Sequence, residues 1–530
     1  MKRILMLMLA ASMVFSACAS SDNKEDSVIT ATAGEQVNEN KNNNKDIVLA
    51  MRPASTLNPL LNEDESVDKI LRILYRPLVD LDQTGKPQAS IAESWYYTDE
   101  GRSMVVNIKQ NMQWHDGSSI TADDIIYSIN TLKSAGENVF YKNCVKNITS
   151  CTKTGTYSLE VHFSGAYSGN VYSLCFLPIS SRWNKGSDKS LEPLGNGAFK
   201  FESFTAAKEL VLMPTENSFG TVPSIEKITV RMTTDADTDV YSFSRRITDC
   251  VDADESDMGK HNLSDGANKY EYTSNYYDFM GFNFKNDILA EKNIRKAVAY
   301  AVPIDSIIEG IYLSNAVRTS SPICPTSYLY EKDAKLYNYS LEGAKKYFEL
   351  AGFKVENDTG IRKKEQDGDL QQLSFRLLVN SESEERVQIA RKIQEELRAV
   401  GCEINIESVP FEEYTQKLES GDFDMFLGGW QMSAEPYPGF MLSSAQIGGT
   451  NYISYSSEKM DQLLSAAYSA SGNAAVLEAY SALQKEIAEE LPYLSIAYRK
   501  SALFTDSRIK GEIKPSMNDC YKTIGQWSID

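Results

Sequence analysis

The strongest constraint on the fold lies between residues 373 and 430, where strand-like and helix-like patterns alternate. Two runs in which every second residue is apolar predict half-buried strands: Leu373, Phe375, Leu377 and Val379, then Cys402, Ile404 and Ile406. Apolar residues spaced by four, four and three, with a glycine after them, predict the helix between these strands: Ile389, Ile393, Leu397, Val400 and then Gly401. A second amphipathic helix is predicted over 411–418, and a third apolar run follows Gly421. Strand–helix–strand–helix–strand predicts three parallel strands and a mixed α/β fold.

The third apolar run reads Phe423-Asp424-Met425-Phe426-Leu427-Gly428-Gly429-Trp430. In open α/β sheets, ligands bind beyond the carboxyl ends of the strands, and Gly428, Gly429 and Trp430 lie at such an end. Glycine lets another backbone approach closely, and an indole ring offers a broad apolar face with one hydrogen-bond donor. Two interpretations stay open at this point: a ligand-binding site, or a core tryptophan beside a turn.

The N-terminus has the pattern of an export signal. Lys2 and Arg3 precede an apolar or small-residue run over 4–15, which is too short to span a bilayer, and Ser16-Ala17-Cys18 follows. We therefore predict a signal peptide over 1–17 and a lipid-modified Cys18 that becomes the new N-terminus. The alternative is ordinary signal cleavage with a chance cysteine.

A polar segment follows the predicted lipid. Residues 18–45 are rich in Ser, Asn, Asp, Lys, Glu and Thr, a composition that cannot bury enough apolar surface to fold, so we expect a disordered tether. Roughly 485 residues then remain, which is more than one core normally supports, so two or three lobes are expected.

The formal charge is −19, and losing Lys2 and Arg3 with the signal gives −21 (−19 − 2). This acidity argues against nucleic acid and anionic lipid as partners. After Cys18, seven cysteines remain, an odd number, so at least one is expected to be unpaired. Cys144 and Cys151 could close a small loop, but the sequence alone does not establish pairing. No CxxC pair and no zinc-type histidine spacing occurs, so neither a metal nor a cofactor is expected.

An exported hydrolase is the enzyme class to consider. It needs a nucleophile with an oriented base, or paired carboxylates, and neither GxSxG nor HExxH occurs. His115 lies in the Trp114-His115-Asp116-Gly117 segment, which we interpret as a turn. A carboxylate pair stays open, but the sequence favours a protein without catalytic activity.

Several short segments occur in one order along the chain: Thr56-Leu57-Asn58-Pro59-Leu60, Leu74-Tyr75-Arg76-Pro77-Leu78-Val79, Trp114-His115-Asp116-Gly117, Thr121-Ala122-Asp123-Asp124-Ile125, Gly195-Asn196-Gly197-Ala198-Phe199, Ile294-Arg295-Lys296-Ala297-Val298-Ala299-Tyr300-Ala301 and Gly421-Asp422-Phe423-Asp424. In this order the chain resembles the extracellular solute-binding lipoproteins of peptide and nickel ABC transporters. The resemblance covers nearly all of 47–498.

The resemblance implies a periplasmic-binding-protein-like α/β fold: two lobes joined by a hinge, with an extra subdomain inserted in the first lobe. It implies that the first lobe comprises 46–71, 190–275 and 496–530, that the added subdomain covers 72–189, and that the second lobe covers 276–495. Closure of the lobes would trap an extended peptide, mainly through backbone hydrogen bonds.

The resemblance also implies site residues. Gly429 and Trp430 match a ligand-contacting position of the family, and Gln431 follows them. Peptide-binding relatives carry an Asp shortly after this Trp that pairs with the ligand's α-amino group. Here that Asp is missing, and Glu435 supplies a carboxylate in another register or is simply solvated. Tyr277 either lines the cleft or lies in the core. Pro303 departs from the family pattern and is predicted to end a helix early.

These features predict a monomeric substrate-binding lipoprotein of an ABC importer that captures a peptide and delivers it to a membrane permease. It would be lipid-anchored on the outer face of the cell membrane, and the long tether favours a Gram-positive surface over a periplasm. The alternatives are the same fold binding an oligosaccharide or a nickel chelate, and the exported hydrolase.

Overall fold

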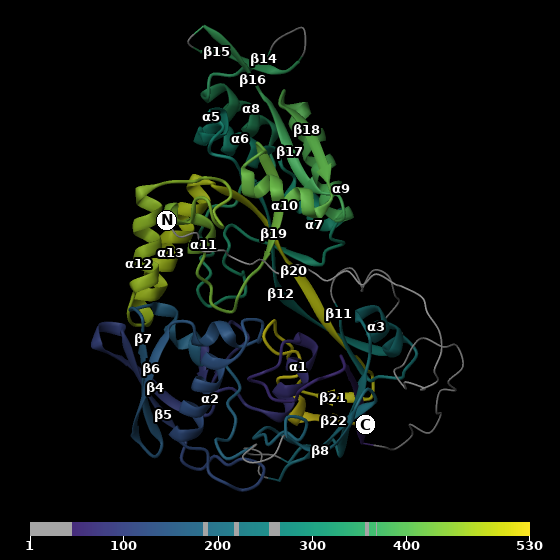
Figure 1. Cartoon of the computed structure of the whole chain (residues 1–530). Coiled ribbons are helices and arrows are strands. Elements are labelled where there is room, and N and C mark those ends of the chain that lie inside the picture. The colour runs from purple at the N-terminus through teal and green to yellow at the C-terminus, as the bar shows by residue number, and fades with distance from the viewer. Residues whose placement is uncertain (1–44, 184–188, 217–221, 254–265, 356–359, 367) are drawn as a thin grey trace, which may run out of the picture.

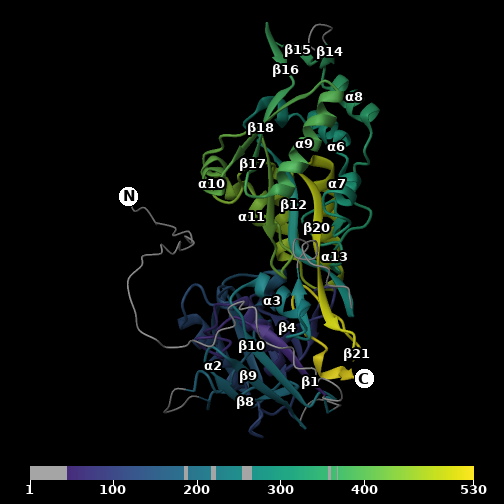
Figure 2. The same ribbon diagram turned by 90° about the vertical axis from the view of Figure 1, so that its right-hand side faces the viewer.

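Two long antiparallel strands, β12 (Ala267–Phe282) and β20 (Tyr493–Asp506), run between two bodies of the molecule (Figures 1 and 2). The computed structural model describes residues 45–183, 189–216, 222–253, 266–355, 360–366 and 368–530. The predicted signal peptide, Cys18 and all of the predicted tether except residue 45 lie outside these residues. The predicted two-lobed α/β arrangement is confirmed.

The first lobe, at the bottom of Figure 1, is built around a four-stranded sheet in the order β1-β10-β9-β8, with β1 parallel to β10. Its elements come from the start, the middle and the end of the chain: β1 (Asp46–Met51), α1 (Glu65–Leu74), β8 (Phe199–Thr205), β9 (Glu209–Pro214), β10 (Lys227–Met232), α3 (Ala236–Ser244), β11 (Cys250–Ala253), β21 (Ile509–Gly511) and β22 (Trp527–Ile529).

The added subdomain carries an antiparallel sheet in the order β4-β5-β7-β6. Its elements are β2 (Val79–Leu81), β3 (Pro87–Ala89), β4 (Ala92–Thr98), β5 (Ser103–Ile108), α2 (Ala122–Ser134), β6 (Ile148–Gly155), β7 (Ser158–Phe163) and the 3-10 helix Ser168–Leu174. Val106 and Val161 of this sheet lie in the same hydrophobic cluster as Ile47 and Val230 of the first lobe. The subdomain is therefore joined to the first lobe by one continuous core.

The second lobe contains most of a seven-stranded sheet in the order β11-β20-β12-β19-β17-β18, with β13 on β20. Besides β12 and β20, the elements of this lobe are α5 (Asp287–Ala290), α6 (Lys292–Ala301), α7 (Ile304–Gly310), β13 (Ala316–Arg318), α8 (Leu341–Leu350), β14 (Lys354–Val355), β15 (Arg362–Gln366), β16 (Asp369–Gln372), β17 (Ser374–Asn380), α9 (Glu384–Ala399), β18 (Glu403–Val409), α10 (Phe411–Ser420), β19 (Met425–Gln431), α11 (Gly439–Leu442), α12 (Glu458–Ser469) and α13 (Asn473–Glu490).

The strand–helix–strand–helix–strand prediction is confirmed, because β17 pairs in parallel with both β18 and β19. Its helix ends are also confirmed. Gly401 follows α9 with φ +81°, and Gly421 follows α10 with φ +73°, both in the left-handed region that glycine adopts without strain. Pro303 separates α6 from α7, as predicted for a residue without a backbone N–H.

Strand β19 continues through both glycines, so the alternative of a turn at Gly428-Gly429 is wrong. Its parallel pairing with β17 stops at Phe426, while its antiparallel pairing with β12 continues to Gln431. The glycines thus lie just beyond the carboxyl end of the parallel part of the sheet. This edge faces the first lobe in Figure 1.

The two through-strands change register where they pass between the lobes. The pairing of β12 with β20 is interrupted between Thr273 and Tyr277, so Ser274, Asn275 and Tyr276 lie in a bulge. A bulge bends a strand and leaves residues without ladder partners, and this one falls beside the predicted 275/276 boundary. The predicted lobe boundaries themselves stay a prediction.

Two further observations bear on the sequence predictions. Within the described ranges no helix combines the length and the apolar character that a membrane span needs. All seven cysteines from Cys144 to Cys520 carry free thiols, so Cys144 and Cys151 are not joined.

Candidate functional site

A cavity of about 350 Å³ lies between the two lobes; we call it the first cavity. Three parts of the chain line it. The first lobe and its subdomain supply Glu65, Arg72, Pro77, Val79, Asp80, Leu81, Phe140, Tyr141, Asn143, Cys144, Asn147, Tyr172, Ser173 and Cys175. The bulge and the segment around the end of β19 supply Asn275, Gln431, Met432, Ser433, Ala434 and Glu435, and the C-terminal segment supplies Ser516, Met517, Asn518, Asp519 and Lys522.

A second cavity of about 420 Å³ adjoins the first and shares nine lining residues with it: Glu65, Arg72, Phe140, Asn275, Gln431, Ser516, Met517, Asn518 and Asp519. It extends along β12 to Tyr272, Ser274 and Tyr276. Ser274, Tyr276 and Ser501 also line a third cavity of about 290 Å³, whose charged lining residues are Arg386, Arg499 and Lys500. We call this third cavity the basic pocket. The three cavities share lining residues and therefore lie next to one another along the cleft between the lobes.

The pleat of β19 decides which predicted residues face this cleft. Side chains alternate between the two faces of a strand, and directly opposed residues on neighbouring strands share a face. Tyr277 is opposite Trp430, and Tyr276 is opposite Gln431. Gln431 and Tyr276 line the second cavity, so Tyr277 and Trp430 point to the opposite face of the sheet.

Tyr277 lies in the core and lines none of these cavities, which corrects its predicted place at the cleft. Its side chain is 0% exposed, and its hydroxyl lies 2.7 Å from Ser495 Oγ. The neighbouring Tyr276 is 47% exposed and takes the cleft position instead. The sequence carried the signal for this choice, since a one-residue step along a strand reverses the face.

Trp430 is half-buried against the helical side of the second lobe. Its ring stacks on Tyr452 at 6.2 Å and meets Phe440 edge-on at 5.3 Å. These rings fix the orientation of the indole. In this structure Trp430 supports the wall behind the cleft and lines none of the three cavities.

Gly429 faces the cleft side of β19, and its missing side chain makes room for an ion cluster. A Cβ built there would lie 2.3 Å from Arg386 Nη2 and 2.8 Å from Asp278 Oδ1. Asp278 is 3% exposed and accepts hydrogen bonds from Arg499 Nε at 2.6 Å and Arg386 Nη2 at 2.9 Å, with Tyr312 Oη at 3.1 Å. Burial opposes its ionisation, but the two guanidinium groups hold the pKa of Asp278 below its ordinary value.

Glu435 lies in the first cavity with an uncompensated carboxylate. Among the described residues this carboxylate has neither a hydrogen-bond nor an ion-pair partner; burial raises the pKa of Glu435 to about 7. A half-buried carboxylate without a partner is costly, and an ammonium group of a ligand would offset that cost.

Asp519 is a second cavity carboxylate, which the sequence analysis missed. Burial raises its pKa to about 6, against the lowering effect of Arg72, and Tyr521 N–H donates to Oδ1 at 2.9 Å. Nothing local in the sequence marks Asp519 as a cavity residue, because Arg72 and Asp80, which influence its pKa, lie more than four hundred residues earlier in the chain.

The basic side chains of the first cavity are already paired. Arg72 Nε lies 2.8 Å from Asp68 Oδ2, and Lys522 Nζ lies 3.0 Å from Asp80 Oδ2. Glu435 and Asp519 are therefore the carboxylates left without an ion pair, which gives this end of the cleft an acidic character. His115 lies elsewhere, with Nε2 3.1 Å from Gly197 O, at the predicted turn.

Among the residues that the structure describes, no group of three or more His, Cys, Asp or Glu side chains is placed so that it could hold a metal ion. Cys144 and Cys175 both line the first cavity, but burial raises the pKa of Cys144 to about 12, which keeps its thiol protonated.

Comparison with known proteins agrees with this two-lobed cleft. The family described as "Bacterial extracellular solute-binding proteins, family 5 Middle" matches residues 86–451. The chain is 26% identical to the "Oligopeptide-binding protein AppA" of Bacillus subtilis (strain 168), over 99% of this chain and 98% of that protein.

Two solved structures share the fold. The structure of AppA from Bacillus subtilis in complex with a nonapeptide has a TM-score of 0.60 at 24% identity, covering 92% of this chain and 99% of that one. The structure of NikZ from Campylobacter jejuni in complex with Ni(L-His) has a TM-score of 0.65 at 20% identity, covering 92% and 100%. Their ligands differ in kind, so the fold alone does not name the ligand. With a family match over well beyond half its length, the chain belongs to the bacterial extracellular solute-binding proteins, family 5.

Proposed function

We propose that this chain is the substrate-binding lipoprotein of an ABC importer and that it captures a peptide in the cleft between its lobes. The similarity to an oligopeptide-binding protein over nearly the whole chain supports this proposal. The observation that carries it is the charge arrangement of the cleft. Carboxylates without an ion pair line the first cavity, while the charged residues lining the basic pocket are all cationic and pair with Asp278, Glu385 and Glu271, which lie outside the pocket lining. A peptide with free ends carries one charge of each sign.

Glu435 is the proposed partner of the ligand's α-amino group. It follows β19 by four residues, and its carboxylate lacks any partner that the described chain could supply. An ammonium group in hydrogen-bond contact would favour the ionised form of Glu435, so binding near neutral pH would release a proton. Gln431 and Gly429 are the proposed neighbours along the bound backbone.

Arg386, Arg499 and Lys500 are the proposed partners of the ligand's carboxylate. Arg386 Nε is buried and has no hydrogen-bond partner among the described residues, and Arg386 lines the basic pocket. A bidentate carboxylate suits the planar guanidinium group. Because the second cavity joins the basic pocket to the first cavity, an extended ligand could reach both ends.

The proposal extends to the location of the protein. We propose that a lipid on Cys18 holds the chain on the outer face of the cell membrane, that 18–45 serve as the tether, and that the loaded protein, as a monomer, docks on the membrane-embedded permease. A Gram-positive surface remains the preferred setting. The work of this chain would be binding and release of solute, with ATP hydrolysis in other subunits.

The first test is native mass spectrometry of the soluble chain beginning after Cys18, purified from cells. Extra masses that fragment into short peptides are expected. A single non-peptide mass would favour the oligosaccharide or chelate alternative and contradict the peptide proposal.

The second test uses calorimetry with one pentapeptide in three forms: free, N-acetylated and C-amidated. We expect each modification to weaken binding by about tenfold or more, since each removes a charge-assisted contact. Glu435→Gln should remove the penalty for acetylation and retain the penalty for amidation. The matched control is Glu412→Gln, an exposed acid on α10. Equal binding of free and acetylated peptide by the wild type would contradict the role of Glu435.

A further inference from the structure

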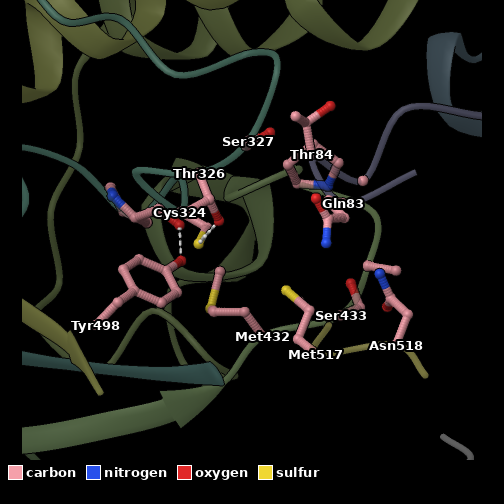
Figure 3. A pocket seen from close by; sticks show the side chains of 14 residues that line it. Gln83, Thr84, Cys324, Thr326, Ser327, Met432, Ser433, Tyr498, Met517 and Asn518 are labelled. Atoms are coloured by element: carbon pink, nitrogen blue, oxygen red, sulfur yellow. Dashed lines mark hydrogen bonds between the residues drawn. The ribbon is translucent and has the colours of Figure 1, made fainter. Parts of the chain in front are cut away.

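A small pocket of about 30 Å³ borders the first cavity; we call it the sulfur-lined pocket (Figure 3). It shares Met432, Ser433, Ala434, Met517 and Asn518 with the first cavity. Three sulfur atoms border it, those of Cys324, Met432 and Met517, and none of its lining side chains is charged.

Two polar side chains of this pocket are engaged with other atoms of its lining. Thr326 Oγ1 lies 3.2 Å from Cys324 Sγ, and the Tyr498 hydroxyl donates to Pro322 O. Thioether and thiol groups are polarisable and mostly apolar, so these walls favour an uncharged group. A charged ligand group would find no counter-ion there.

Both lobes build the walls. The C-terminal segment of the first lobe supplies Met517 and Asn518, and the added subdomain supplies the tip of the β2–β3 hairpin, Gln83 to Gly85. Tyr328 N–H of the second lobe donates to Thr84 O at 3.1 Å, and Tyr172 Oη donates to Gly85 O at 3.0 Å. These hydrogen bonds hold the hairpin wall of the pocket in place in this arrangement of the lobes.

We propose that the sulfur-lined pocket receives the side chain of the ligand residue whose amino group meets Glu435, and that it admits only small, uncharged side chains. This inference rests on the proposed function. Its basis is the path of one segment: Ala434 and Pro436 line the pocket, while Glu435 between them lines the first cavity. The pocket therefore lies beside the segment that carries Glu435.

The volume sets the size limit. One water molecule needs about 10–15 Å³ of cavity volume, so a pocket of about 30 Å³ holds two or three non-hydrogen atoms. Ala, Ser, Cys and Val side chains fit this limit, and Phe, Trp, Arg and Lys exceed it. Specificity would arise from exclusion of large side chains more than from attraction of small ones.

The test compares pentapeptides that differ only in their first residue, Ala or Phe, by calorimetry. We expect the wild type to bind the Ala peptide at least about tenfold more tightly. Met517→Ala enlarges the pocket from the first lobe, and Cys324→Ala enlarges it from the second. At least one of these variants should reduce the Ala-to-Phe ratio to about threefold or less while leaving the Ala peptide bound.

Met213→Ala is the matched control, because Met213 is a half-buried methionine of β9 outside the pocket, so the ratio should stay at its wild-type value. Equal wild-type affinities for the two peptides would overturn this inference and leave the proposed function standing. An unchanged ratio in both enlarged variants would also overturn it. If neither peptide binds, both proposals fail.

Discussion

Gly429 shows how a residue without a side chain can position charged groups. The volume that a Cβ would need is occupied by the Arg386 guanidinium and the Asp278 carboxylate, on the face of β19 that lines the cleft. The absence of a side chain at Gly429 leaves space for the charged groups of Arg386 and Asp278. From the sequence, this space was expected to accommodate the backbone of a ligand. The two roles are compatible, because Arg386 also lines the basic pocket.

We expect Gly429→Ala to lower the free energy of unfolding by about 1–3 kcal/mol, because the new methyl group would displace Arg386 or Asp278. Urea unfolding at neutral pH would measure this loss. Gly165→Ala is the control, since no atom lies within 4 Å of a Cβ built at Gly165. Equal stability of the two variants would contradict this account.

Glu435 links ligand binding to the stability of the empty protein. Its folded-state pKa of about 7 exceeds the unfolded value of about 4.3, so the folded state binds the proton more tightly. Stability contributed by this group is therefore lost as pH rises from about 4.3 to about 7. Glu435→Gln should stabilise the ligand-free protein at pH 8, by about 1 kcal/mol for this partly exposed group, and have little effect at pH 4.

Chemical unfolding at these two pH values would check this prediction, with Glu412→Gln as the control. A Glu435→Gln effect of equal size at both pH values would show that the carboxylate is not held in an unfavourable ionised state.

Among the predicted site residues, local sequence could identify the segment but not the side of the sheet. Gly429 and Gln431 lie on one face of β19 and Trp430 on the other, with Tyr277 beside it on β12. The family resemblance named the positions, while the period of two decides which of them meet the cleft. On β12 the same alternation places Tyr276, and not Tyr277, on the face that lines the cleft.

At the scale of elements, Asp278 ties together parts of the second lobe that local sequence does not connect. Its partners come from α9 (Arg386), β20 (Arg499) and the segment after α7 (Tyr312), and Arg499 also pairs with Glu385 at 2.9 Å. Removing a buried charge that has several partners strongly destabilises the folded protein, because the charges of the partners are left uncompensated.

We expect Asp278→Asn to lower the free energy of unfolding by about 3 kcal/mol at pH 7. The pKa of Asp278 is depressed in the folded state, so its contribution is present above the unfolded value near pH 4 and is lost as pH falls below it. The difference between wild type and variant should therefore shrink when urea unfolding is repeated at pH 3. Asp369→Asn, at an exposed position on β16, is the control. A difference independent of pH would contradict the ionic account.

Local patterns predicted the elements of the second lobe well. The helix that became α9, its glycine stop and the parallel order of β17, β18 and β19 follow from spacing alone. The antiparallel partners β12 and β20 could not be predicted in this way, because their pairing joins segments more than two hundred residues apart. The basic pocket depends on that pairing, since Arg499 and Lys500 belong to β20.

At the scale of the whole molecule, the lobes touch directly at a place distinct from the through-strands. Tyr167 of the added subdomain stacks on Tyr468 of the second lobe at 4.1 Å and meets Tyr437 edge-on at 5.9 Å. Ser168 Oγ donates to Ala467 O at 2.8 Å. In Figure 1 the lower end of α12 reaches the subdomain, while β12 and β20 cross between the lobes elsewhere. These contacts stabilise this arrangement of the two lobes.

We expect Tyr468→Ala to favour a more open molecule, because an aromatic pair contributes about 0.5–1.5 kcal/mol. Small-angle scattering should show a larger radius of gyration without ligand, and ligand affinity should fall by about three- to tenfold. Tyr96→Ala is the control, because Tyr96 is an exposed tyrosine of the added subdomain. Unchanged dimensions and affinity in Tyr468→Ala would show that these contacts do not influence closure.

The C-terminal segment has a consequence for how the protein is made. Trp527 and Ile509 are fully buried in the core that also contains Ile47 and Leu49 of β1, and Ser516 to Cys520 line the cleft. A ribosome builds the first strand of this lobe early and the residues that complete its core last. The nascent chain therefore carries an unfinished lobe through almost the whole of its synthesis, and a premature stop in the last codons would leave that core open with the second lobe already complete.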